Sequence, residues 1–185
     1  MRLSVGFLLR FFALAAVLFA LWSFAGVGDA YGRAVLATAN PFMSLLSGFR
    51  VTGATSSPTG LDVLIARAGE EAVLMPLQPR EAFSGLIPFL ALAGASSGVV
   101  LRRRLQAIAF GGAVLFVFHI GLALVGPYMT GLPQEGLPLV WIRRVNTLID
   151  VFYGFYGLIG YAALPFLLWF WLVHRSTARG SEATL

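Results

Sequence analysis

The sequence contains no cysteine and no lysine, and all thirteen of its basic residues are arginines. The lack of cysteine excludes disulfides, thiolate nucleophiles and cysteine-bound clusters or haem. Charge of either sign is also scarce, since charged residues make up 11% of the chain against 58% hydrophobic residues. With a mean hydropathy of +0.84, this composition is too apolar for a soluble domain. We therefore expect an integral membrane protein.

The net charge of +5 comes from arginines that are scattered along the chain. Nucleic-acid binding needs a basic stripe with interleaved aromatic residues, and the sequence has none. We expect no nucleic-acid partner, and we interpret the basic charge as a signal of membrane topology.

Apolar runs long enough to cross a ~30 Å hydrocarbon core occur four times in the chain. The sequence therefore predicts an all-α membrane protein with one membrane domain over residues 1–185 and four transmembrane helices. A secretory signal peptide is the alternative for the first run, but Gly28-Asp29-Ala30 is a poor cleavage site. The predicted spans are residues 5–27, 82–101, 105–126 and 151–173.

The second and third runs are joined by Arg102, Arg103 and Arg104. Arginines in short loops favour the cytoplasmic side, so this turn and both chain termini are expected in the cytoplasm. The expected location is a bacterial inner membrane, crossed several times, with membrane lipid as one partner.

Residues 29–81 form a mixed segment that this orientation places outside the membrane. Its first part, residues 31–49, has the pattern of an interfacial helix that Pro41 is expected to divide. Short apolar stretches at 49–52, 61–65 and 72–77 follow, separated by turn-rich sequence. They predict two or three short strands, which we interpret as a small β-hairpin insertion.

Glycines mark the expected helix contacts. Gly94 and Gly98 form a small-xxx-small pair, which lets helix backbones approach closely in lipid. Contact with a helix of the same chain is the favoured interpretation, with homodimerisation or another subunit as alternatives. Gly154 and Gly157 suggest a similar packing face on the last apolar run.

His119 lies inside the third apolar run, where an ionisable residue needs a partner or a wet cavity. One interpretation is a polar cleft on the outer side, shared with Arg143, Arg144 and Glu81; the other is a packing role. Ser84 could join His119 as the nucleophile and base of a membrane peptidase or transpeptidase. No orienting acid and no metal-ligand spacing accompany them, so no metal or other cofactor is expected.

The order of features from Tyr31 to Trp171 resembles the membrane core of the exosortase and archaeosortase family. Ala82-Phe83-Ser84-Gly85 stands where that family has an Ala-Cys-Ser-Gly motif at a helix start. The resemblance implies a polytopic protein linked to the cleavage and transfer of sorting-signal proteins at the outer face of the membrane.

This chain departs from the family at the catalytic positions. Phe83 occupies the place of the nucleophilic cysteine, and His119 and Leu122 fall where the family has Asn-x-x-Arg. The later family histidine would fall near Phe152 or Tyr153. The resemblance therefore implies a non-catalytic relative, expected to be an accessory or scaffold subunit beside an active exosortase. The alternatives are the Ser84/His119 peptidase and a structural subunit of an unrelated energy-transducing or transport complex.

Overall fold

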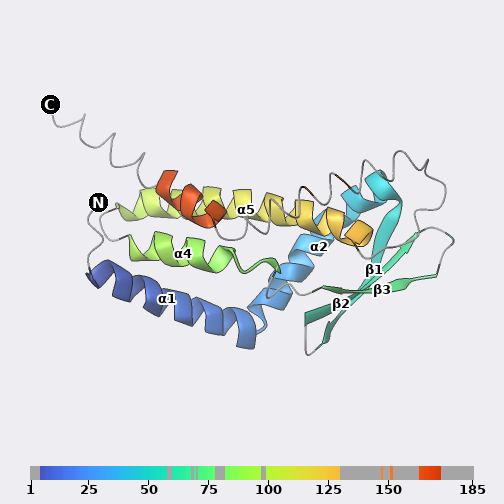
Figure 1. The fold of residues 1–185 in the computed structure, drawn as a ribbon, viewed down its shortest axis with the longest axis horizontal. Helices are drawn as coiled ribbons and strands as arrows, with labels where there is room; N and C mark the ends of the chain where they lie inside the picture. The colour runs from blue at the N-terminus through green and yellow to red at the C-terminus, as the bar shows by residue number, and fades with distance from the viewer. Residues whose placement is uncertain are drawn as a thin grey trace.

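We describe the fold from a computed structural model of the chain, which places helices along one long axis and a sheet beyond one end of them (Figure 1). The structure describes residues 5–57, 60–67, 69, 71–77, 82–96, 99–129, 147, 151 and 163–171. Within these residues the elements are α1 (Val5–Phe24), α2 (Val27–Ser47), β1 (Phe49–Ser57), β2 (Gly60–Arg67), β3 (Val73–Leu77), α4 (Leu86–Ala95) and α5 (Leu101–Met129). Residues 163–171 are also helical.

Apart from Arg10 and Ser23, helix α1 is apolar on all sides, and it packs along a single stripe. Buried or half-buried residues recur every three to four positions along this stripe. They are Phe7, Phe11, Ala15, Leu18 and Trp22. The other faces expose large apolar side chains such as Phe12 and Phe19. A helix that is apolar all round and mostly unburied suits a lipid environment, and α1 is long enough to span a membrane.

Helix α2 follows α1 after a sharp change of direction at Gly26. This residue has a φ of 73°, a left-handed conformation that glycine adopts without steric cost. Helix α2 then runs unbroken through Pro41 to Ser47. The prediction that Pro41 divides this helix is therefore wrong. Proline removes one hydrogen bond from the helix. Packing of α2 against both α5 and β1 keeps the helix intact despite this loss.

The three strands form one antiparallel sheet in the order β1-β2-β3. Strands occur at all three predicted stretches, because β-branched and apolar residues alternate there between turn-rich segments. The register shifts between Val51 and Gly53, where β1 carries an irregularity. The inner face packs Leu61, Val63 and Ile65 against α2 in the main apolar core.

The predicted all-α fold class is wrong, since a three-stranded sheet, and not a hairpin, makes the fold mixed α and β. The prediction of four transmembrane helices is also wrong. Among the described residues, two helices are long and apolar enough to cross a membrane: Val5–Phe24 and Leu101–Val125. Most of the predicted span at 151–173 lies outside the part of the chain that the structure describes.

The predicted span 82–101 contains the short helix α4, whose ten residues give a length of only ~15 Å. Its end has a clear physical cause. The hydroxyl of Ser96 donates to the carbonyl of Leu92 at 2.7 Å. From α5, the Arg104 guanidinium donates to the carbonyls of Ser96 at 2.6 Å and Val99 at 3.2 Å. An arginine expected to mark a loop instead satisfies carbonyls beyond the carboxyl end of α4.

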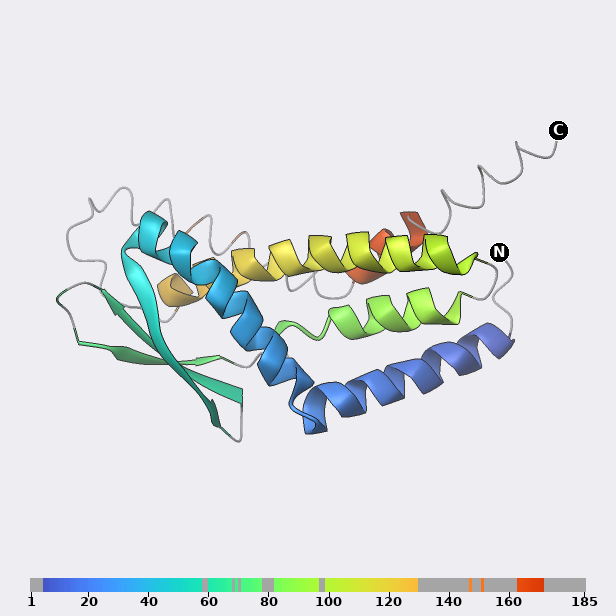
Figure 2. The same ribbon diagram turned by 180° about the vertical axis from the view of Figure 1, so that it is seen from behind.

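Helices α1, α4 and α5 lie side by side, and α2 crosses obliquely from the end of α1 towards the far end of α5 (Figures 1 and 2). Residues 163–171 pack at the end that holds Arg104. There the indole N–H of Trp169 donates to Ser96 Oγ at 2.9 Å, and the Trp169 ring lies 6.0 Å from the Phe7 ring. Helical segments from the beginning and the end of the described chain thus meet at one end of the bundle.

Candidate functional site

The candidate site is a cluster of aromatic rings around His119 of α5. The end of α1, the start of α2 and the turn that precedes α4 meet α5 there. His119 is 1% exposed and is one of the buried polar residues of the described chain. Its Nδ1 atom lies 2.8 Å from the hydroxyl of Tyr31, which comes from the first turns of α2. This hydrogen bond joins two residues that are 88 positions apart in the sequence.

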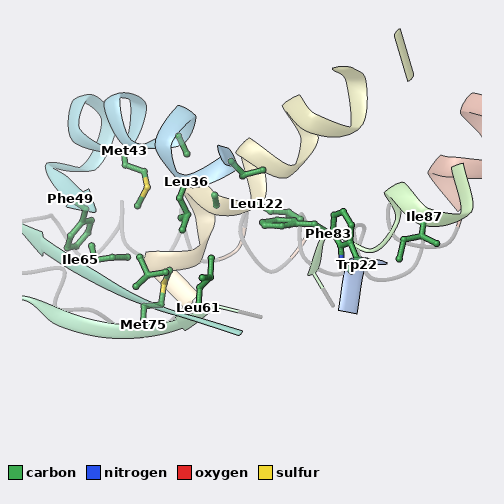
Figure 3. Close-up of a cluster of buried hydrophobic side chains, with 14 residues drawn as sticks. Trp22, Leu36, Met43, Phe49, Leu61, Ile65, Met75, Phe83, Ile87 and Leu122 are labelled. Atoms are coloured by element: carbon green, nitrogen blue, oxygen red, sulfur yellow. The ribbon is translucent and has the colours of Figure 1, made fainter. Parts of the chain in front are cut away.

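Phe83 packs directly on the imidazole of His119. Their ring centroids are 4.8 Å apart, and the Phe83 side chain is 1% exposed. Figure 3 shows Phe83 and Trp22 between the sheet-side core and Ile87 of α4, within the same apolar cluster. Phe83 therefore fills the space beside the histidine with an apolar ring.

Tyr31 organises the rest of the cluster. Its ring lies 5.3 Å from Trp22 and 5.8 Å from each of Phe83 and Phe116, with an edge-to-face arrangement for the last two. Such contacts contribute about 0.5–1.5 kcal/mol each beyond simple area burial. The rings hold the Tyr31 hydroxyl in position for His119.

Burial raises the pKa of Tyr31 to about 12. The phenol therefore keeps its proton at any physiological pH and bonds to the imidazole as a neutral partner. The imidazole of His119 is thus packed against the rings of Tyr31 and Phe83 and bonded to a neutral phenol.

Ser84 follows Phe83 in the turn that leads into α4. Ser84 is half-buried, and its backbone carbonyl accepts a hydrogen bond from the backbone N–H of Ile87 at 2.9 Å. The structure thus brings the two candidate catalytic residues, Ser84 and His119, into the same region of the fold. Phe83, from the same turn, contacts the imidazole.

Other predicted site residues lie outside the described residues. This applies to the cleft residues Arg143, Arg144 and Glu81, and to the packing glycines Gly98, Gly154 and Gly157. Within the described part of the chain, no group of three or more His, Asp or Glu side chains could hold a metal ion.

Gly94 lies where the sequence analysis placed a close contact, on α4 against α1. A Cβ atom added there would lie 2.9 Å from Leu14 Cδ1. A tighter position, Gly111, was missed: an added Cβ would lie 2.1 Å from Phe89 Cζ. The Gly111-Gly112 pair was the signal that could have identified it. Tyr31 was also missed, because nothing near it in sequence indicates its partner.

Comparison of the chain with family models, curated proteins and solved structures finds no match.

Proposed function

We propose that this chain is a non-catalytic subunit of a bacterial inner-membrane complex, and that it works beside an exosortase-type sorting enzyme. The proposal combines the Ala82-Phe83-Ser84-Gly85 resemblance with the contents of the aromatic cluster. Its role is to shape or stabilise the complex, and the chemistry belongs to the partner enzyme.

The observation that carries this proposal is the packing of Phe83 against His119. A nucleophilic site needs a reactive atom beside a base, with room for a carbonyl group between them. Here an apolar ring contacts the base at a centroid distance of 4.8 Å, and both side chains are 1% exposed. This arrangement supports a structural role for the region.

The distribution of apolar surface supports placement in a membrane. Helices α1 and α5 are apolar enough to span one, and each exposes large side chains that water would solvate poorly. Arg102 and Arg103 are exposed at the start of α5, and the Phe7–Trp169 contact lies at this same end. With that end in the cytoplasm, both termini are cytoplasmic and the sheet projects from the opposite face.

The alternative class is a peptidase that uses Ser84 and His119, and a complementation experiment separates it from the subunit. In a strain that lacks this chain, we expect incomplete processing of proteins with sorting signals, and we expect the Ser84→Ala variant to restore it fully. The hydroxyl has no chemical role under the proposal. Loss of processing by Ser84→Ala at normal abundance and normal unfolding temperature would instead identify a serine nucleophile.

A further inference from the structure

Three exposed arginines lie at the end of the bundle where both candidate spans begin. Arg10 comes from α1, whereas Arg102 and Arg103 come from the first turn of α5. Figures 1 and 2 show that α1 and α5 both begin at this end of the molecule, away from the sheet. We refer to these three residues as the arginine belt.

Arg104 follows the belt directly in sequence but is placed differently. Its guanidinium donates to the carbonyls of Ser96 at 2.6 Å and Val99 at 3.2 Å, so it lies against the end of α4. Arg102 and Arg103 belong to the same turn of α5 and have exposed side chains. The three consecutive arginines therefore divide into one that joins two helices and two that face the surroundings of the protein.

Exposed apolar side chains flank the arginine belt on both helices. Next to Arg10, Leu9 is 67% exposed and Phe12 is 65% exposed. Next to Arg102, Leu101 is 65% exposed. Cations and apolar side chains thus share single turns of helices that are long and apolar enough to cross a membrane. At the boundary of a bilayer both are accommodated, because apolar side chains contact acyl chains while the long arginine side chain extends to the headgroups.

The carboxylates of the described residues lie elsewhere in the fold. Asp29 is in the first turn of α2, beyond the far end of α1, while Asp62 is on β2 and Glu71 precedes β3. In a membrane, the anions that reach the start of α1 and α5 are the phosphates of lipid headgroups. Arginine suits them, since its planar fork of N–H groups can donate two parallel hydrogen bonds to one phosphate.

We propose that the arginine belt binds anionic phospholipid, and that the protein selects such lipid from its bilayer. Each guanidinium donates hydrogen bonds to headgroup phosphate oxygens, and the apolar side chains beside it contact the acyl chains. A zwitterionic lipid carries its own cation beside the phosphate, so a lipid with a net negative charge binds better. This inference rests on the proposed function, because it needs the membrane placement given there.

Lipid selection can be measured on the full chain in vesicles of phosphatidylcholine. Spin-labelled phosphatidylglycerol and spin-labelled phosphatidylcholine are compared by electron paramagnetic resonance, which reports the fraction of each label immobilised on the protein. The test variant is Arg10→Gln/Arg102→Gln. Its matched control is Arg50→Gln/Arg67→Gln, which removes two charges from the sheet. A further variant, Arg104→Gln, removes the contacts with the carbonyls beyond α4.

The unchanged protein is expected to prefer the phosphatidylglycerol label. Arg10→Gln/Arg102→Gln should lower this preference by about fivefold or more, the effect of a positive charge close to an anionic membrane surface. The control pair should keep the preference, and raised ionic strength should weaken it. Arg104→Gln should lower the unfolding temperature and keep the preference. No preference in the unchanged protein, or an equal loss in the test and control pairs, would overturn the lipid site.

Inorganic phosphate identifies the source of the anion. Added at the same ionic strength as a chloride control, it should leave the preference for phosphatidylglycerol unchanged. If phosphate abolishes the preference and chloride does not, the arginines bind soluble phosphate and the lipid site is refuted.

Flotation of the vesicles separates this failure from failure of the proposed membrane placement. A chain that floats with the vesicles and resists extraction by alkaline carbonate, yet shows no lipid preference, would refute the lipid site alone. A chain that stays in the aqueous fraction would refute both the lipid site and the placement.

Discussion

The close approach of α4 and α5 at Gly111 gives the sharpest stability prediction. A Cβ atom at this position would lie 2.1, 2.6 and 2.9 Å from three atoms of the Phe89 ring. Phe89 is fully buried, so its ring has little room to move aside. Overpacking of this kind costs about 1–3 kcal/mol, against a helix-propensity gain of about 1 kcal/mol for glycine to alanine. Subtracting the gain, we expect Gly111→Ala to lower the free energy of unfolding by up to about 2 kcal/mol, and to leave the protein about 1–3 kcal/mol less stable than it would be with the propensity gain alone.

Gly112 supplies a matched control on the same helix. A Cβ atom added there meets nothing within 4 Å, so Gly112→Ala should keep the propensity gain without a clash. The free energy of unfolding can be measured by circular dichroism during titration with a denaturing detergent. Phe89→Leu should reduce the cost of Gly111→Ala, because it removes ring atoms from the contact. Equal stability of the Gly111→Ala and Gly112→Ala proteins would refute this account of the α4–α5 interface.

Three further predictions concern other contacts. Gly94→Leu should destabilise the α1–α4 pair by about 1–3 kcal/mol, and Leu14→Ala should restore part of the loss; unchanged thermal stability in detergent would contradict the contact. Asn40→Ala should lower the free energy of unfolding by about 1–2 kcal/mol, because the Asn40 side-chain amide pairs with the N–H and the carbonyl of Val51 on the edge strand β1. Amide hydrogen exchange at Val51 should also rise in this variant. Tyr31→Phe should remove the tyrosinate absorbance step near pH 12. In the unchanged protein, stability should fall from about pH 10, the ordinary tyrosine pKa, towards pH 12, since the unfolded chain loses its proton first. An unaltered titration curve in Tyr31→Phe would mean that this phenol has no raised pKa.

The sequence predicted those parts of the fold that depend on local pattern. Continuous apolar runs identified α1 and α5, and turn-rich separators located the strand stretches, because both signals are carried by neighbouring residues. The number of strands that pair was left at two or three, and the hairpin interpretation was wrong. The end of α4 was not predictable in this way. It depends on Arg104, which belongs to the next helix and reaches back to the carbonyls of Ser96 and Val99, inside the predicted span 82–101.

In the candidate site, too, the sequence predicted what a local pattern marks and missed what depends on contacts between distant residues. His119 could be selected from sequence, because a histidine in an apolar run is unusual. Its partner Tyr31 could not, since the hydrogen bond depends on how α2 crosses α5. The continuation of α2 through Pro41 was missed for a similar reason: packing on two sides outweighs the local preference of proline to end a helix.

The most direct test of the central claim is native mass spectrometry of the complex purified through a tag on this chain from its own membrane. The account predicts a complex of fixed stoichiometry that contains the chain and an active exosortase-type enzyme, whose processing activity survives Ser84→Ala in this chain. Recovery of the chain alone, or with only an unrelated respiratory or transport assembly, would contradict the proposed role.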